Sequence, residues 1–142
     1  MIFAFQTGRD NAPRQQSDRF DHCKLKNLKV FLNSDYYPYG DLNLDFSNRE
    51  VSEAYDMLIR LQESYTGNKS EPLIDYEQYV TADPFIAIDC SKQNESIKEG
   101  VVDIKLEIEC HDKVPANTTA YCLIIHDKIF EYNPLTNEIN KL

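Results

Sequence analysis

Cysteine and histidine residues lie next to or near each other at three places in this 142-residue sequence, and such pairs could begin a metal site. The pairs are His22 with Cys23, Cys110 with His111, and Cys122 with His126. Cys122 and His126 are four residues apart, so on one strand they would share a face. At about 3.3 Å per residue they would lie about 13 Å from each other, which is too far for both to bind one tetrahedral zinc ion. No C-x-x-C, H-x-H or H-E-x-x-H motif occurs. We therefore predict no metal site and no cofactor.

Cys90 is the best candidate for a catalytic nucleophile. It follows an apolar segment at 85–88, where its thiol could meet solvent and one of the three histidines could act as its base. The alternative is a small buried apolar side chain, which is the usual state of a free cysteine and the interpretation we favour. The carboxylates form no recognisable catalytic pair, and the four scattered glycines exclude a glycine-rich phosphate loop. We predict no catalytic residue and no enzyme activity.

The elements that would hold these side chains are mostly strands. From Val102 to Cys110, every even position is apolar and every odd position is charged. A period of two fits a strand and not a helix, so we predict a strand over 101–110 with its even face on a core and Leu106 at its centre. An apolar face opposite a charged face is typical of an antiparallel sheet with one side in water.

Seven or eight short strands are expected in all. The other strand segments are 2–5, 24–33, 42–46, 85–88, 120–125, 129–132 and 138–142. In the third of these, Leu42, Leu44 and Phe46 share one face. Residues 85–88 and 120–125 are apolar on both faces, which is expected of strands buried in a sandwich or at a subunit contact. The pattern predicts a soluble, β-rich sandwich.

Helical spacing appears in one long segment. Ser47-Asn-Arg-Glu50 has the form of a capping box, and the apolar residues that follow recur every three or four positions up to Gly67. We predict one helix over about 49–65. Residues 75–80 can form a short second helix before Asp83-Pro84 stops it.

Length, charge and cysteine content set broad limits on the protein. A chain of 142 residues is a typical single-domain length, so we expect one domain over 1–142. The net charge of −9 repels phosphates and anionic lipids, so direct binding to nucleic acid or to a membrane is not expected. No apolar run is as long as a membrane span, and the N-terminus lacks a secretion signal. Four widely spaced cysteines, expected to be free and buried, fit an intracellular protein.

Three local features leave alternatives open. Residues 1–32 carry a net charge of +3, so this end could dock on an acidic neighbouring subunit, although we favour a solvated strand rich in lysine (Lys24, Lys26 and Lys29). The aromatic turn at 36–40 could pack over a sandwich end, which we favour, or stack on a ligand. Residues 7–22 are expected to be a long loop. The strand at 2–5 begins directly after Met1, which suggests a chain cut from something longer.

Five segments, in order and spread over nearly the whole chain, resemble one known family. They are FQTGR at 5–9, FDHCKLKN at 20–27, FLNSDYYPYGDLNLDF at 31–46, IDCSKQNES at 88–96 and TTAYCLIIHDKIFEYNPLTN at 118–137. The chain resembles the C-terminal part of the double jelly-roll proteins found in animal genomes, which are similar to the major capsid proteins of Polinton (Maverick) elements and related viruses.

The resemblance implies a mainly β fold, an antiparallel jelly-roll β-sandwich, with the helix at about 49–65 inserted between strands. It also implies two jelly rolls in one polypeptide, three polypeptides in a pseudo-hexagonal capsomer, and capsomers that tile an icosahedral shell. No catalytic residue is implied. The chain is too short for two jelly rolls, so 1–142 would be the C-terminal one. About eight strands in two packed antiparallel sheets also fit the strand segments predicted above.

Three functions compete at this point. The leading one is a structural capsid or capsid-derived subunit of the cell interior or a virion, which self-associates as a homotrimer or higher or pairs with the missing N-terminal jelly roll. The second is a domesticated protein-binding module, in which loops 7–22, 34–41 and 111–118 at one end of the sandwich hold a protein partner. The third is a hydrolase that depends on Cys90.

Overall fold

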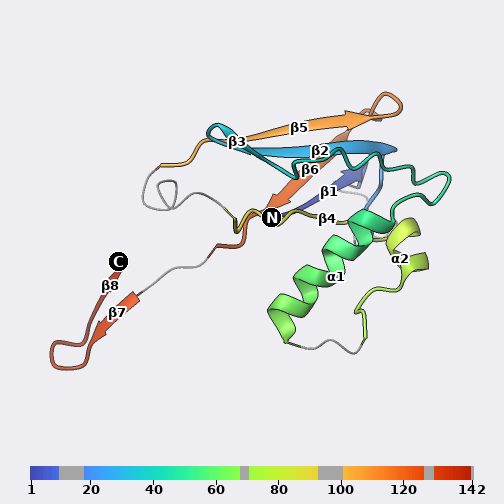
Figure 1. Ribbon diagram of the computed structural model, residues 1–142. Helices are drawn as coiled ribbons and strands as arrows, with labels where there is room; N and C mark the ends of the chain where they lie inside the picture. Colours follow the sequence, from blue (N-terminus) through green and yellow to red (C-terminus); the bar gives the residue numbers. More distant parts are fainter. Residues whose placement is uncertain (10–17, 68–70, 93–100, 127–129, 142) are drawn as a thin grey trace.

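The computed structural model describes residues 1–9, 18–67, 71–92, 101–126 and 130–141, and its elements are mostly strands (Figure 1). In chain order they are β1 (Ile2–Thr7), β2 (Leu25–Leu32), β3 (Asp35–Tyr37), α1 (Ser52–Thr66), α2 (Tyr76–Thr81), β4 (Ile86–Ala87), β5 (Ile104–Cys110), β6 (Thr118–Leu123), β7 (Phe130–Asn133) and β8 (Glu138–Lys141). All the strand pairs are antiparallel. The fold is therefore mainly β with two helices, as the sequence predicts.

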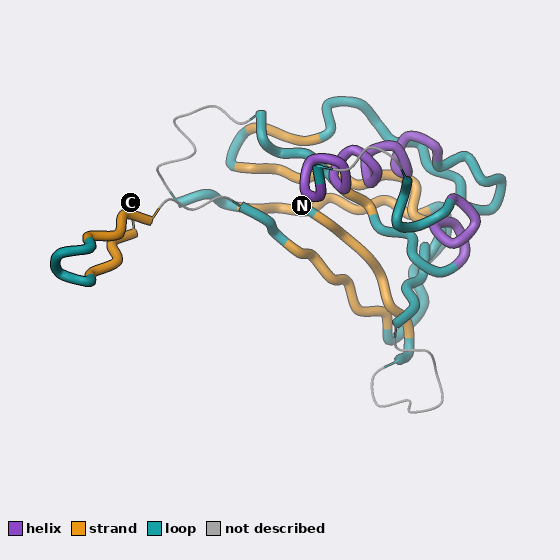
Figure 2. The backbone as a smooth tube through the Cα atoms, turned by 90° about the horizontal axis from the view of Figure 1, so that it is seen from below, coloured by secondary structure: helices purple, strands orange, loops and turns teal. Residues whose placement is uncertain are grey.

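Two three-stranded sheets form the body of the molecule. One sheet has the order β4-β1-β6 and the other has the order β3-β2-β5. Phe3 and Phe5 of β1 share one buried cluster with Leu28 and Val30 of β2, so the two sheets pack face to face. This arrangement is a jelly-roll-like β-sandwich and confirms the predicted fold class. Figures 1 and 2 show the third sheet, the β7–β8 hairpin, apart from this body.

The core fills the space between the two sheets and extends under α1. Its largest fully buried side chains include Tyr79, Phe3, Leu28 and Ile86. Ala54 of α1 is also fully buried, and α1 packs against the short strand β4. Every buried residue among those the structure describes lies between Phe3 and Ile88.

The strand predicted at 24–33 is confirmed as β2, and it fixes the register of β5. In the ladder between them, Leu28 lies opposite Ile108, Val30 opposite Leu106, and Leu32 opposite Ile104. Opposite residues of a ladder share a face, so the even positions of β5 face the core side, as the alternation predicts. The strand is shorter than the predicted 101–110, since residues 101–103 precede it without ladder pairing.

The predicted strand at 42–46 is wrong, although its alternation has a structural meaning. Leu42, Leu44 and Phe46 are all buried, but only Asp45 makes a β-bridge, an isolated one to Glu50. Asn43 has a φ of 45°, which breaks an extended strand. The segment follows β2 through hydrogen bonds from the Leu44 N–H to the Lys26 carbonyl and from the Asn43 N–H to Asn27 Oδ1. Alternate burial therefore arises here without a ladder.

Helix α1 begins later than predicted because the proposed capping box does not form. Asp45 Oδ1 accepts hydrogen bonds from the backbone N–H groups of Ser47 and Asn48, which holds this segment in a turn. The helix starts at Ser52, and its N-cap, Val51, makes no side-chain capping bond. The predicted end is confirmed: Gly67 adopts the left-handed conformation at φ 67°, which a glycine adopts without steric cost.

The short helix predicted at 75–80 is confirmed as α2. Asp75 caps it, because its side chain accepts a hydrogen bond from the Gln78 N–H at 2.7 Å. Tyr79 and Val80 are its buried residues. Tyr79 contributes to the core of the sandwich, so this helix closes the cluster next to Phe46 and Tyr55.

The remaining predicted segments have mixed outcomes. Strands appear at β1, β4, β6, β7 and β8, and the aromatic turn at 36–40 begins inside a strand, β3, that pairs with β2. Asp21 makes a β-bridge with Phe5, so the predicted loop 7–22 returns to the sandwich before it ends. Residues 10–17 of this loop lie outside the described residues.

Candidate interaction surface

The histidines proposed as metal ligands have other roles in the structure. The ring of His22 stacks on Phe46 at 4.9 Å between centroids, and its Nδ1 accepts a hydrogen bond from the Lys24 N–H. Burial lowers the pKa of His22, against the opposing effect of Asp21. His111 Nε2 donates to the Leu44 carbonyl at 2.8 Å. Among the described residues, no group of three or more metal-binding side chains lies close enough to hold an ion.

Cys90 has an environment opposite to that of an activated nucleophile. Its Sγ–H donates weakly to the Ile88 carbonyl at 3.9 Å. Burial raises the pKa of the Cys90 thiol, and the charge of Asp89 raises it further. The N-terminal ammonium has an opposing effect but does not reverse the shift. A raised thiol pKa reduces the thiolate fraction at neutral pH, which weakens nucleophilic attack.

The four cysteines are free thiols, and the expectation that they are buried is wrong. Cys23, Cys90 and Cys110 are half-buried, while Cys122 is exposed on β6. Burial raises the pKa of Cys110, as does its neighbour Cys23. The sheets therefore bring thiols together that are far apart in the sequence.

One lateral side of the sandwich, formed by β3 and β4, is closed. Its edge strands have three and two residues, and short edges limit pairing with other chains. The hydroxyl of Tyr37 in β3 donates to the carbonyl of Lys92, just beyond β4, at 3.2 Å. The Met1 ammonium donates to the Ile88 carbonyl at 2.8 Å. The Tyr37 bond therefore joins the two sheets on this side, while the Met1 bond holds β1 to β4 within one sheet. Helix α1 lies against β4 (Figure 1).

The other lateral side, formed by β5 and β6, is open. Both strands lie at the edges of their sheets, and they have seven and six residues. Ile104 and Ile108 face the core side of β5 but are 45% and 39% exposed. On and just after β6, Tyr121, Leu123, Ile124 and Ile125 are all exposed. We call this surface, made of β5, β6 and residues 124–125, the open edge.

The β6 part of the open edge lacks the features that usually protect an edge strand, although β5 carries charges at Lys105, Glu107 and Glu109. Natural edge strands carry charges, prolines or bulges that prevent pairing with another chain. Residues 118–125 contain no charged residue, no proline and no glycine. Most of these residues have high β propensity, so a strand from another segment can pair with the free edge of β6. The sequence contains the signal, two apolar faces at 120–125, but the pattern alone cannot show that both faces remain exposed.

Two lysines of β2, Lys26 and Lys29, and Lys24 just before the strand are paired within the chain. Lys24 bonds to Asp112, Lys26 Nζ lies 2.7 Å from Glu109, and Lys29 Nζ lies 2.6 Å from Asp41. The first two pairs join β2 to β5 and to the residues that follow β5. The strand is thus solvated, as favoured above, and its charges are neutralised by the chain's own carboxylates. This pairing disfavours the alternative, in which the basic end docks on an acidic neighbour.

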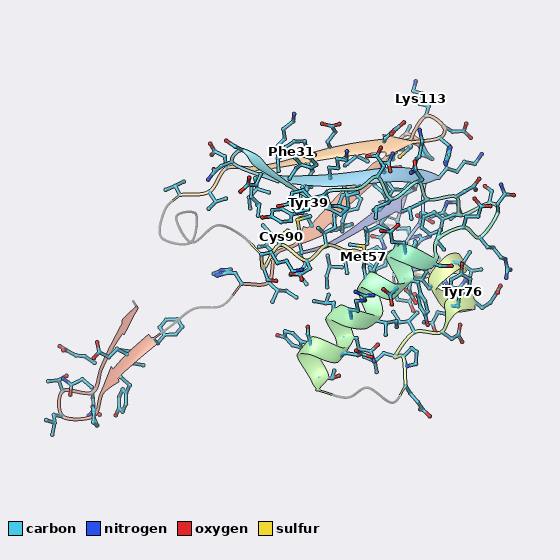
Figure 3. All side chains as sticks on the ribbon, viewed as in Figure 1. Phe31, Tyr39, Met57, Tyr76, Cys90 and Lys113 are labelled. Carbon is cyan, nitrogen blue, oxygen red and sulfur yellow. The ribbon has the colours of Figure 1, made fainter. Side chains whose placement is uncertain are left out.

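The aromatic turn forms a small exposed cluster. Tyr36 contacts Phe31 and Tyr39 at centroid distances of 5.7 and 5.8 Å, and Tyr39 is 68% exposed. Lys29 and Lys105 lie over the Tyr36 and Phe31 rings at 5.4 and 5.2 Å. We call these five residues the aromatic cluster, and Figure 3 labels Phe31 and Tyr39 in it.

The three loops of the predicted binding module do not lie together. The Gly8 N–H bonds to the Asn117 carbonyl, so loops 7–22 and 111–118 meet at one end. Residue 34 follows the end of β2 that pairs with Ile104, whereas 111 follows the end of β5 that pairs with Leu25. Figure 3 shows Tyr39 and Lys113 well apart. The prediction that 34–41 joins the other two loops is therefore wrong, because antiparallel pairing puts these loops at opposite ends of one sheet.

The comparisons with known proteins agree with this architecture. A family model described as the double jelly roll-like domain matches residues 1–130, which include both three-stranded sheets and both helices. Neither the curated proteins nor the solved structures gave a match. Within the described part of the chain, no helix has the length and apolarity that a membrane span requires. The family match extends over far more than half of the chain, and the protein belongs to the double jelly roll-like domain family.

Proposed function

We propose that this protein is a structural capsid or capsid-derived subunit that acts by self-association. The double jelly roll-like domain has a capsid-type fold, and such domains are typically structural and not enzymatic. The raised pKa of the Cys90 thiol also opposes the hydrolase hypothesis.

The observation that carries the proposal is the open edge. Four large apolar side chains on or just after β6, together with Ile104 and Ile108 of β5, are more than one third exposed. Tyr121 and Leu123 lie opposite Ala4 and Ile2 and so face away from the interior of the sandwich, whereas Ile104 and Ile108 face the core side. Several exposed apolar side chains along one pair of sheet edges often mark a protein interface. Their position at the edges of two stacked sheets favours a partner that continues the sheets.

The proposed partner is another jelly roll. It is either a second copy of this chain or the N-terminal jelly roll of a two-domain architecture, of which residues 1–142 would be the C-terminal part. The resemblance to the major capsid proteins of Polinton (Maverick) elements favours three-fold assembly. Identical chains usually form closed symmetric oligomers, so a homotrimer is the expected product.

Light scattering on the purified protein over a range of concentrations tests the proposal. We expect a homotrimer or a larger oligomer whose population increases with protein concentration. Because the net charge of −9 opposes association, added salt should strengthen it by screening. Negative-stain microscopy of the same samples shows whether shells form. A monomer at every protein and salt concentration would contradict the proposal.

A second candidate, a protein-binding module, is favoured by the aromatic cluster. Exposed tyrosine rings next to lysines are common at protein interfaces, because the rings contribute a large contact area at low entropic cost. Tyr39 is the most exposed ring of the cluster. A strict monomer that loses binding to a purified partner after Tyr39→Ala would favour this function over assembly.

A further inference from the structure

The β7–β8 hairpin is an amphipathic ribbon without a described partner. Tyr132 lies opposite Ile139 in its ladder, and Phe130 lies on the same face two residues before Tyr132. All three side chains are more than half exposed. Glu131 and Glu138 occupy the other face, since they lie one residue away from Tyr132 and Ile139. The hairpin thus presents an apolar face that nothing in the described structure covers.

Such a hairpin is not stable by itself. A two-stranded hairpin is marginally stable at best in water, and stability requires a third strand or a packed apolar face. β7 and β8 pair only with each other among the described strands. They lie away from the chain's own sandwich in both views of the backbone (Figures 1 and 2). The hairpin therefore needs a surface that adds a strand and covers Phe130, Tyr132 and Ile139.

The open edge of the same chain is such a surface. β6 offers a free, uncharged edge of six residues for strand addition, and β5 offers Ile104 and Ile108 on the core side. A hairpin added beside β6 extends the β4-β1-β6 sheet, and its apolar face then lies against these isoleucines. One chain thus carries two complementary halves of an interface.

We propose that the β7–β8 hairpin of one copy docks on the open edge of a second copy. The donor strand pairs with β6, and the apolar side chains of the hairpin complete the uncovered part of the core. A contact between unlike surfaces of identical chains is heterologous, so it forms a closed ring when the rotation permits. The inference rests on the proposed self-association and specifies its contact surfaces. The hairpin lies almost entirely beyond residues 1–130, the region matched by the family model.

Complementation between two full-length variants tests this exchange. Tyr132→Glu disables the hairpin as donor, and Ile108→Glu disables the open edge as acceptor, because each puts a charge into the apolar contact. Each variant alone should associate at least about tenfold more weakly than the wild type. A mixture of the two should form a dimer, because the intact hairpin of the Ile108→Glu chain meets the intact edge of the Tyr132→Glu chain.

Matched controls use the opposite faces of the same strands. Glu131→Gln in the hairpin and Glu107→Gln in β5 should leave the oligomer unchanged. Far-UV circular dichroism and thermal unfolding check that each variant folds. If Tyr132→Glu or Ile108→Glu fails to fold, Ile139→Lys and Ile104→Glu replace them at neighbouring positions of the same faces.

The outcomes separate this inference from the proposed function. Monomeric variants whose mixture forms dimers, measured by sedimentation velocity, support the exchange. Variants that keep the wild-type oligomer overturn the exchange and leave self-association intact through another surface. If both variants are monomeric and their mixture also stays monomeric, the exchange between two copies is overturned. That result would favour docking of the hairpin on the open edge of its own chain. A monomeric wild-type protein overturns both proposals.

Discussion

Residues 1–92 and residues 101–139 are built from similar apolar strands, yet only the first region has a buried core. β2 and β5 lie side by side in one sheet, and Leu28 faces the same side as Ile108. Leu28 is 0% exposed, whereas Ile108 is 39% exposed. The two strands differ in what lies over them: β1, α1 and α2 contribute to the cluster around Leu28. We call the first region the closed region and the second the open region.

This difference shows that an apolar segment of this chain is not necessarily buried. Residues 120–125 are as apolar as residues 85–88, but the first segment is exposed and the second contributes Ile86 and Ile88 to the core. Folding within one chain therefore uses only part of the apolar surface in this sequence. The remainder is available for association, which is the role that the proposed function gives to the open region.

Alanine substitutions at opposite positions of the β2–β5 ladder should show the largest contrast. Leu28→Ala removes fully buried methyl groups and should lower the free energy of unfolding by about 2–5 kcal/mol. Ile108→Ala should cost less than about 1 kcal/mol in dilute solution, since its site is already partly open to water. Half-buried Leu106 should give an intermediate loss. Urea unfolding measures all three, and equal losses at Leu28 and Ile108 would show that the open region has a covered core.

The sequence predicted which face of a strand points toward the core, but not which other elements pack over that face. The alternation at 102–110 identified the core side of β5, because the period of a strand assigns faces without knowledge of its neighbours. It could not show that Ile104 stays exposed, since this depends on strands far away in the chain. The predicted start of α1 was wrong for a local reason. Asp45 accepts hydrogen bonds from the backbone N–H groups of Ser47 and Asn48, so these residues form a turn and not the first turn of the helix. The candidate surface was predicted only as a possible subunit contact at 120–125.

Two tyrosines of the closed region test whether its interior is dry. The Tyr55 hydroxyl donates to the Ile74 carbonyl at 2.8 Å, whereas the buried Tyr79 hydroxyl has no partner among the described residues. Tyr55→Phe should lower the free energy of unfolding by about 0.5–1.5 kcal/mol. Tyr79→Phe should be neutral or stabilising by up to about 1 kcal/mol, because it removes an unsatisfied polar group. A clear decrease in the free energy of unfolding for Tyr79→Phe would mean that this hydroxyl is hydrogen-bonded to water. Water would then enter the core of the closed region.

The pH dependence of stability should show His22 as a group of the closed region. Burial lowers its pKa, with Lys24 acting in the same direction and Asp21 against it. The neutral ring therefore contributes fully above about pH 6.5, and stability falls as the pH decreases from there through the folded-state pKa. His22→Phe keeps a ring against Phe46 and should flatten the change in unfolding free energy between about pH 6.5 and 5. An unchanged slope in this variant would assign the dependence to other groups.

The smallest effect is expected at Glu109, whose ion pair lies on the water side of β5. Its carboxylate accepts hydrogen bonds from Lys26 Nζ at 2.7 Å and Asn27 Nδ2 at 2.9 Å, and the bond from Lys26 is the main cause of its lowered pKa. The lowered pKa means that the pair stabilises the fold above the ordinary glutamate pKa and loses this effect as the pH falls through the folded value.

Glu109→Gln should therefore reduce stability slightly at neutral pH and low salt, and the reduction should disappear at about 0.5 M salt, because exposed pairs are screened. Glu107→Gln, two residues away on the same face, is the matched control. If the loss at Glu109 persists in salt and exceeds the loss at Ile108, then the outer ion pairs hold β5 in place more than its apolar face does. In that case ion pairs would contribute more than apolar contacts to the stability of β5. The exposure of Ile104 and Ile108 would then no longer indicate a core that a partner completes.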